Sequence, residues 1–222
     1  MPGIDYTLLR QQLRLAPVLD LVGFTATSRQ GPQMRGPCPV HRSTTPRSRS
    51  FAAHLEKHCW HCFGCGAGGN ALDVQIAELE LYLERTAKIE DPTTFHLLKT
   101  IGGVGKILGL TLLYEIHDIR RFAEVGEFLS YARLIRCTHE SSGKKLGVGG
   151  AKIGNAHLKW AFSEAVCLLV RNYPAVKAWQ AKRQKRHGKK KTLGILAARL
   201  GRAVYHMLRK REAFDVRRFL GQ

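Results

Sequence analysis

Two short stretches, Cys38-Pro39-Val40-His41 and Cys62-Phe63-Gly64-Cys65, decide the fold of the first third of this chain of 222 residues. Each stretch places two residues between a pair of potential metal ligands, and twenty residues separate the two pairs. A two-residue spacing lets a tight turn point both side chains at one ion, and a ribbon supplies the second pair from a neighbouring turn. Three thiols and one imidazole without a carboxylate predict a closed, structural zinc site.

The sequence around this ligand set is rich in Gly, Pro, Ser and Arg, so it predicts a core too small to be stable without a metal. Gly64 and Gly66 are expected to supply the left-handed backbone that such turns require. Redox-active or incidental thiols are the alternative interpretation. His58, Cys59 and His61 lie close to the second pair and compete as ligands, but none of them restores two matching turns.

Charge is concentrated in the last part of the chain. The 36 Lys and Arg against 17 Asp and Glu give a net charge of +19, and residues 129–222 alone carry +18. Such a charge favours nucleic acid or an anionic membrane surface as a partner. General stickiness or a role in solubility is the alternative.

A membrane location is disfavoured by the length of the apolar runs. The longest, such as Ile107–Leu113 and Ala165–Val170, are far too short to span a bilayer. Arg10 and Arg14 interrupt the apolar N-terminal stretch, which has no signal-peptide layout. Six cysteines without a secretion signal favour metal ligands or free thiols over disulfides. We therefore expect a cytoplasmic, nucleoid-associated protein.

The predicted fold class is mainly α, in three parts. Residues 1–71 form a small α+β zinc ribbon with a helix at Tyr6–Leu21, residues 72–91 form a coiled-coil-like linker helix, and residues 92–222 form an all-α DNA-binding domain. The linker prediction depends on heptad spacing of four apolar residues: Leu72, Ile76, Leu79 and Leu83. This pattern is weak, because many surface helices share it.

Two helices are predicted in the last part of the chain. Asn155 is expected to cap one that ends before Pro174, and Thr192 to cap another whose apolar face runs from Leu193 to Leu208. Residues 182–191 between them read as a basic connector.

The stretch 97–113 is predicted to be a helix-hairpin-helix. Its Gly-Val-Gly segment, Gly103 to Gly105, allows backbone N–H groups at a helix start to approach a phosphate, and Lys106 adds charge. A tight turn between two packed helices is the structural alternative.

Further nucleic-acid contacts are predicted on both parts of the chain. In the ribbon, a phosphate-binding and stacking face is expected from the three arginines Arg42, Arg47 and Arg49 with the aromatic residues Phe51, Trp60 and Phe63. The alternative is that the aromatic residues pack beneath the metal site and the arginines are solvated. In the second part the expected contacts are Lys144, Lys145, Lys152, Lys189, Lys190, Lys191, Arg199 and Arg202.

The ribbon resembles the zinc-binding domain of DnaG-type bacterial primases. The resemblance covers about residues 5–74 and depends on Gly36–His41, on Arg49-Ser50-Phe51 and on Trp60–Asp73, which ends in Gly-Asn-Ala-Leu-Asp. In that family the ribbon contacts single-stranded template DNA. Nothing in the rest of the chain resembles the primase catalytic domain, so primer synthesis is not implied.

From about Val74 to Leu220 the chain resembles the C-terminal part of insertion-sequence transposases of the Piv-like family, the bridge-RNA-guided recombinases. Four motifs carry the resemblance: Ile101–Gly105, Glu115–Phe122, Ser141–Lys145 and Lys152–Asn155. Gly102 stands where proline is common in that family. The resemblance implies a catalytic serine at Ser141 or Ser142, with Ser141 slightly preferred. From the residues alone, this stretch reads as an ordinary basic loop.

In that family the serine works beside an RuvC-like domain with a DEDD set of acidic Mg²⁺ ligands. Residues 1–71 contain only Asp5, Asp20 and Glu56 as acidic residues, so this chain does not supply that set there. We therefore expect a transposase-related DNA-binding protein of a mobile element without independent strand cleavage. The alternative is a zinc-ribbon adaptor or a primase-related replication factor. Expected partners are DNA, a guide RNA, and self or a full-length transposase bound through the coiled coil.

Overall fold

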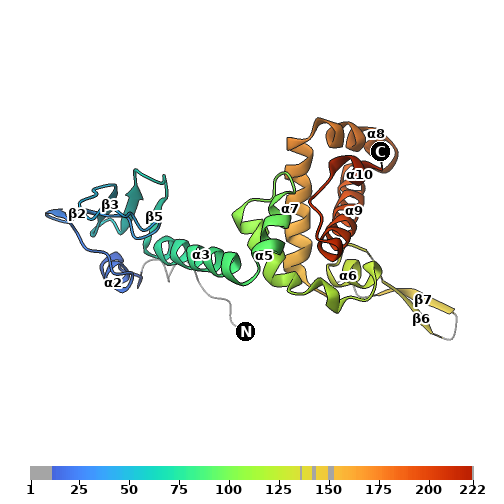
Figure 1. Cartoon of the computed structure of the whole chain (residues 1–222), viewed down its shortest axis with the longest axis horizontal. Helices are drawn as coiled ribbons and strands as arrows, with labels where there is room; N and C mark the ends of the chain where they lie inside the picture. Colours follow the sequence, from blue (N-terminus) through green and yellow to red (C-terminus); the bar gives the residue numbers. More distant parts are fainter. Residues whose placement is uncertain (1–11, 136, 142–143, 150–152, 222) are drawn as a thin grey trace. The chain divides into compact units, whose positions relative to one another are not determined.

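The computed structural model describes residues 12–135, 137–141, 144–149 and 153–221, and the side chains of 12–135 and 153–221. Helices predominate and a small antiparallel sheet lies near the N-terminus, so the predicted mainly α class is confirmed (Figure 1). The chain divides into two compact units, Met1–Arg85 and Thr86–Gln222. None of the described helices combines the length and apolar character that a bilayer span requires.

The first unit contains the short helix α2 (Leu15–Leu21). The predicted helix was longer, but Leu13 and Arg14 are not helical, and residues 1–11 lie outside the described residues. Pro17 gives the physical reason, because its ring clashes with the carbonyl of the residue four positions earlier, Leu13, if the helix continues through it.

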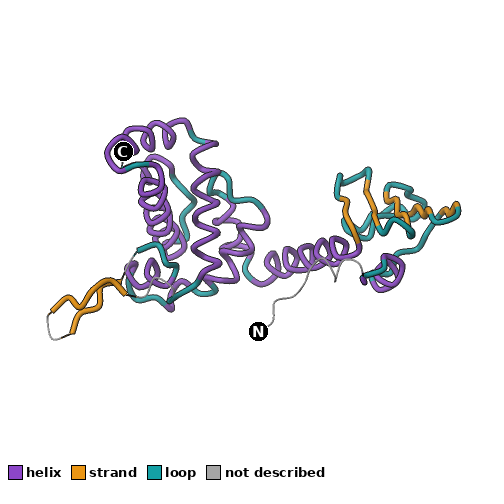
Figure 2. Tube along the Cα trace, turned by 180° about the vertical axis from the view of Figure 1, so that it is seen from behind, coloured by secondary structure: helices purple, strands orange, loops and turns teal. Residues whose placement is uncertain are grey.

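A five-stranded antiparallel sheet forms the ribbon, with its strands in sequence order. Figure 2 draws these strands in orange. The strands are β1 (Ser28–Gln30), β2 (Gln33–Gly36), β3 (Phe51–His54), β4 (Cys59–Cys62) and β5 (Gly68–Asn70). Phe51 pairs with Cys62 and Ala53 with Trp60 across β3 and β4. The apolar core of this unit includes Leu15, Leu19 and Phe51 and also the two buried cysteines, Cys38 and Cys62. Two of the four predicted metal ligands are therefore part of the core.

Helix α3 (Ala71–Glu90) begins directly after β5. The Asn70 side chain accepts hydrogen bonds from the backbone N–H groups of Leu72 (2.9 Å) and Asp73 (3.3 Å), while Asp73 accepts one from the Asn70 N–H (2.7 Å). This reciprocal cap fixes the helix start. Beyond it, the heptad residues Ile76, Leu79 and Leu83 are exposed.

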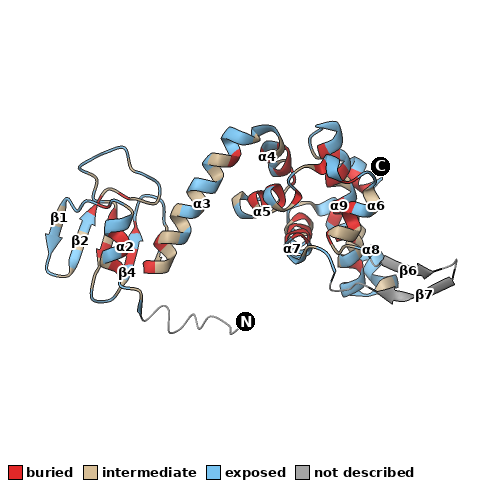
Figure 3. Cartoon of the chain, turned by 90° about the horizontal axis from the view of Figure 1, so that it is seen from below, coloured by how far each residue is buried: buried red, intermediate tan, exposed pale blue. Residues whose placement is uncertain are grey.

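The second unit is a helical body with one hairpin. Its elements are α4 (Pro92–Lys99), α5 (Lys106–Ile116), η1 (Ile119–Arg121), α6 (Val125–Tyr131), β6 (Cys137–Ser141), β7 (Lys144–Gly149), α7 (Ala156–Asn172), α8 (Pro174–His187), α9 (Lys189–Lys210) and α10 (Val216–Leu220). Its buried residues lie largely where α5, α7 and α9 pack together (Figure 3). The β6–β7 hairpin departs from the expected all-α domain.

The predicted cap of α7 is confirmed, because the Asn155 side chain accepts a hydrogen bond from the Leu158 N–H at 2.9 Å. The predicted cap at Thr192 is wrong. Helix α9 begins at Lys189 after Gly188, whose φ of +76° separates it from α8. Thr192 is buried inside the helix and its hydroxyl donates to the Gly188 carbonyl at 2.8 Å. The predicted basic connector is therefore not a loop. Its residues belong to the end of α8 and the start of α9, which meet at Gly188, and three lysines form the start of α9.

Candidate metal centre and nucleic-acid-binding surfaces

The four predicted metal ligands come together in the ribbon. The ligand atoms of Cys38, His41, Cys62 and Cys65 all lie within 4.8 Å of one another, and Cys62 Sγ is 3.7 Å from His41 Nδ1. Cys38 lies just after β2 and Cys62 ends β4, so the sheet fixes both buried sulfurs. His41 and Cys65 approach from the exposed side.

The two turns that carry the ligands are built differently. Gly66 has a φ of +72°, as predicted, and its N–H donates to the Cys62 carbonyl at 2.9 Å. The prediction for Gly64 was wrong, because its φ is not positive, and a Cβ there would make only ordinary contacts with His41 and Ser50. In the first turn the left-handed residue is Arg42, with a φ of +48°.

The protein environment treats the two buried thiols differently. Burial raises the pKa of the Cys38 thiol to about 12. Burial also opposes ionisation of Cys62, but backbone N–H groups of Cys65 and Gly64 donate to its sulfur and lower its pKa overall. Of the two thiols, Cys62 is thus the one whose surroundings favour ionisation, and the thiolate is the form that ligates metals.

The competing ligands have other contacts. His58 Nδ1 accepts a hydrogen bond from the Leu15 N–H at 3.3 Å, and the His61 ring contacts Phe63 edge-on with a centroid distance of 4.8 Å. Cys59 is exposed and lies opposite Asn70 in the sheet. Within the part of the chain that the structure describes, no second group of three or more potential ligands gathers.

The donor set fits zinc. Tetrahedral zinc with Zn–S bonds of about 2.3 Å places its ligands about 3.8 Å apart, a separation that this cluster reaches with small adjustments. All four positions are taken by protein side chains, so the ion would hold the two turns together without offering an open site for catalysis.

The predicted stacking face of the ribbon is only partly exposed. Trp60 is 4% exposed, stacks on Phe51 at 5.2 Å and donates its Nε1–H to the Asn70 carbonyl at 2.8 Å, so the prediction of Trp60 as a contact residue was wrong. Phe63, which belongs to the same predicted face, is 67% exposed, and the Arg35 guanidinium lies 6.0 Å from its ring centroid. Alternation along β4, which buries Trp60 and exposes His61, is the signal that could have indicated this.

The three predicted ribbon arginines lie on the surface. Arg42, Arg47 and Arg49 are all exposed. The Arg42 guanidinium also lies 3.9 Å from the Glu78 carboxylate of α3. Because both side chains are exposed to water, this ion pair contributes little to the stability of the fold.

The glycine turn of the second unit joins α4 to α5. A Cβ on Gly102 would collide with the Tyr173 ring, and one on Gly103, whose φ is +103°, would collide with Leu168. These two glycines therefore allow the turn to pack against the end of α7. Gly105 has open space around it and caps α5 without a side chain, immediately before Lys106. The packing interpretation holds for Gly102 and Gly103, and Gly105 remains available for an anion.

The predicted serine lies at the tip of the β6–β7 hairpin. Ser141 ends β6 and pairs with Lys144 in register, and Lys145 follows in β7; the structure describes their backbone only. Ser142 and Lys152 lie outside the described residues.

The base of the hairpin contains a polar cluster that sequence reasoning did not connect. Asn155 Nδ2 donates to Glu115 Oε2 at 2.5 Å, and the Asn155 N–H donates to the Tyr131 carbonyl at 2.7 Å. The Arg121 guanidinium lies over the Tyr131 ring at 4.7 Å. The hydrogen bond from Asn155, followed by one from Arg121, lowers the pKa of Tyr131. This cluster links the start of α7 to α5 and α6.

The predicted basic residues of α9 are accessible. Lys189, Lys190 and Lys191 are exposed in the first turn, Arg202 is exposed and Arg199 is half-buried.

Comparisons with known proteins give a family match for each of two segments. Residues 4–90 match the CHC2 zinc finger family of the DnaG type, and residues 95–181 match the transposase IS116/IS110/IS902 family. The chain joins a primase-type zinc finger to a transposase-family segment. The first match contains all four ligands, and the second contains the glycine turn, the hairpin and the Asn155 cluster.

Several curated proteins similar to this chain are DNA primases. Those of Geobacillus stearothermophilus, Halalkalibacterium halodurans and Escherichia coli are 47%, 44% and 37% identical over 55, 59 and 97 residues, which are 24%, 26% and 43% of this chain. The chain spans only 9%, 9% and 16% of their lengths. The similarity is therefore to the zinc-finger portion of these primases.

Proposed function

We propose that this chain is a DNA-binding, transposase-related protein of a mobile element whose head is built around a structural zinc ion. The observation that carries the proposal is the presence of both family segments on one chain with a charge of +19. We propose functional parts at 1–71, 72–91 and 92–222, and a cytoplasmic, nucleoid-associated location.

The ribbon is proposed to contact single-stranded DNA. The exposed Phe63 ring offers a face for base stacking, while Arg35 beside it and the exposed Arg42, Arg47 and Arg49 offer charge to phosphates. Base stacking and phosphate contacts together are the usual basis of single-strand binding.

The second unit is proposed to bind phosphates at two helix starts. Helix α5 begins after Gly105 without a side-chain cap, so its first N–H groups can face an anion beside Lys106. Helix α9 begins with Lys189, Lys190 and Lys191, which add three positive charges to the positive end of a helix dipole. Positive charges at this end of a helix repel one another and the dipole, and a bound phosphate backbone would neutralise them.

We propose that the chain does not cleave DNA alone. If Ser141 or Ser142 corresponds to the family nucleophile, an attack on phosphorus still requires stabilisation of the developing charge. Residues 1–71 offer three acidic residues in place of a DEDD set, so Mg²⁺ would have to come with a full-length transposase. The exposed apolar residues of α3 support a mixed or self-assembled oligomer as the way to bring it.

A recombination assay with element ends and guide RNA tests this proposal. The chain alone is expected to yield no recombinant product. Product is expected when a full-length transposase is added in which alanine replaces the serine that corresponds to Ser141 or Ser142. Product formed by the wild-type chain alone, and lost with Ser141→Ala or Ser142→Ala, contradicts the proposed inactivity.

A zinc-finger adaptor or a primase-related replication factor is the second candidate, favoured by the similarity of the ribbon to DNA primases. This candidate predicts binding to single-stranded DNA without preference for element ends. A competition measurement between element-end and unrelated oligonucleotides of equal length separates the two functions.

A further inference from the structure

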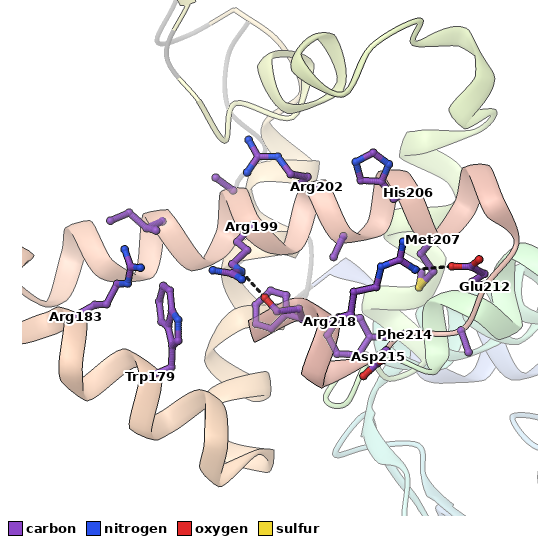
Figure 4. Close-up of a pocket in the computed structure, with 15 residues that line it drawn as sticks. Trp179, Arg183, Arg199, Arg202, His206, Met207, Glu212, Phe214, Asp215 and Arg218 are labelled. Atoms are coloured by element: carbon purple, nitrogen blue, oxygen red, sulfur yellow. Dashed lines mark hydrogen bonds and ion pairs between the residues drawn. The ribbon is translucent and has the colours of Figure 1, made fainter. Parts of the chain in front are cut away.

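Between α8, α9 and α10 lies a cavity of about 620 Å³ whose lining is both apolar and cationic. Trp179 projects into it from α8, Arg199 from α9, and Phe214 from the segment before α10 (Figure 4). Except for Trp179, the residues that line the cavity lie after residue 181, beyond the segment that matches the transposase family. The family match therefore assigns no role to it.

The positive charge of the cavity is only partly neutralised. Four arginines and two carboxylates line it. Glu212 is paired with Arg218 at 2.7 Å, and Asp215 caps α10 through the Arg217 N–H at 2.8 Å. Among the described residues, no carboxylate forms an ion pair with Arg183, Arg199 or Arg202.

The half-buried Arg199 shows the effect of this excess. Its Nε–H donates to the Phe219 carbonyl, which fixes the guanidinium at the cavity. Burial, and then the positive charges of Arg183 and Arg202, lower the pKa of Arg199. An anion in the cavity would remove that repulsion.

The aromatic lining adds a second requirement for the ligand. The Arg183 and Arg199 guanidinium carbons lie 4.6 and 5.5 Å from the Trp179 ring centroid, and the Phe214 and Phe219 rings are 5.6 Å apart. Flat arginine and aromatic groups accept a planar base by stacking, while guanidinium N–H groups bind phosphate. The cavity volume is in the range that small ligands occupy.

We propose that this cavity binds one unpaired nucleotide of a single-stranded nucleic acid, with the base among Trp179 and Phe214 and its phosphate at Arg183, Arg199 and Arg202. The proposal rests on the proposed nucleic-acid binding of the chain and names its site in the second unit. A base inside a duplex cannot present its face to a cavity, so the nucleotide is single-stranded or flipped out.

Photocrosslinking gives a test that is local to the cavity. The zinc-loaded full chain would be irradiated with ten-nucleotide single strands, in DNA and RNA form, that contain 5-iodouracil, and the adducts would be mapped by mass spectrometry. We expect adducts at Trp179 or Phe214. Adducts confined to the ribbon would overturn the assignment.

Affinity measurements provide the second readout. Arg183→Gln and Phe214→Leu are expected to weaken binding of the single strand about tenfold, with Phe214→Leu losing the preference for bases over an abasic strand of equal length. Arg171→Gln, an exposed α7 residue outside the cavity, is the charge-matched control and is expected to keep that preference. Circular dichroism verifies that each variant is folded.

The outcomes separate this proposal from the general one. If the wild-type chain binds no single strand, both proposals fail. If it binds and the cavity variants behave like Arg171→Gln, only the cavity assignment fails. If an acidic, phenylalanine-containing peptide binds more tightly than the single strand, and the same variants lose that peptide binding, the ligand is a protein segment and the nucleotide assignment is wrong.

Discussion

Cys62 combines a packing role and a ligand role in one side chain. Cys62 pairs with Phe51 across the sheet, and its buried sulfur belongs to the four-ligand cluster. We expect Cys62→Ser to reduce bound zinc from one ion per chain to near zero and to unfold the ribbon, because the metal links turns that a small core holds only weakly. Elemental analysis and near-ultraviolet circular dichroism measure both effects.

The exposed Cys59 offers a matched control on the same strand. Cys59→Ser is expected to keep the zinc content and the fold of the wild type. Full zinc content in Cys62→Ser would show that the ion is held elsewhere.

Asn155 is the residue with the most extensive polar contacts at the base of the hairpin. Asn155→Ala removes the cap of α7 and leaves Glu115 without its 2.5 Å partner. We expect the free energy of unfolding of the second unit to fall by about 1–2 kcal/mol, the usual cost of losing a helix cap. Ser163→Ala, an exposed α7 position, is the control in urea denaturation; an equal effect of the two changes would contradict the cap role.

At this scale the sequence predicted the metal ligands because the spacing of ligand pairs is a local property. It did not distinguish Trp60 from Phe63, since which aromatic is buried depends on the strand register that places Trp60 opposite Ala53. The contact between Asn155 and Glu115 joins residues 40 positions apart and has no local signal.

Helix α3 carries an exposed apolar surface. Leu79 is 61% exposed, and Ile76 and Leu83 lie on heptad positions with it. If this surface mediates the proposed self-association, Leu79→Lys should shift the chain from dimer to monomer in sedimentation equilibrium. Gln75→Lys adds the same charge outside the heptad positions and should not; an unchanged monomer for the wild type would contradict self-association through α3.

Elements with a strong helical period were predictable, and α7 ends before Pro174 as expected. The β6–β7 hairpin was not, because this stretch is rich in Gly and Lys and only Leu146 and Val148 alternate as apolar residues, too few to mark a strand. The start of α9 was misplaced since Thr192 resembles a cap residue, yet Gly188 ends α8 and allows a new helix four residues earlier.

The distribution of charge over the whole chain predicts a steep dependence of DNA affinity on salt. Replacing Lys189, Lys190 and Lys191 with Gln should reduce the slope of log affinity against log salt by about 2.7, if each lysine neutralises one duplex phosphate. The same change at Arg171, Lys177 and Lys210 is the control. Equal slopes for the two triple variants would exclude the start of α9 from the DNA interface.

The two compact units predict two unfolding events. Chelation of zinc should abolish the ribbon signal while the helical signal of Thr86–Gln222 persists, because the four ligands all lie in the first unit. Thermal melting followed by far- and near-ultraviolet circular dichroism measures this. A ribbon that keeps its melting temperature after zinc removal would show that its apolar core is sufficient.

At the scale of the molecule, composition indicated nucleic acid as a partner because nearly all of the excess charge falls after residue 128. It did not indicate the cavity beside Arg199, since a cavity arises only when α8, α9 and α10 are packed together.

The three lysines that open α9 have a consequence for how the protein responds to its surroundings. Like charges at the positive end of a helix cost about 0.3–1 kcal/mol each at low ionic strength. Polyphosphate or nucleic acid bound there would cancel that repulsion and make the last long helix harder to melt. The chain would thus be most resistant to heat and proteolysis when loaded, so its lifetime in the cell would follow the supply of polyanion.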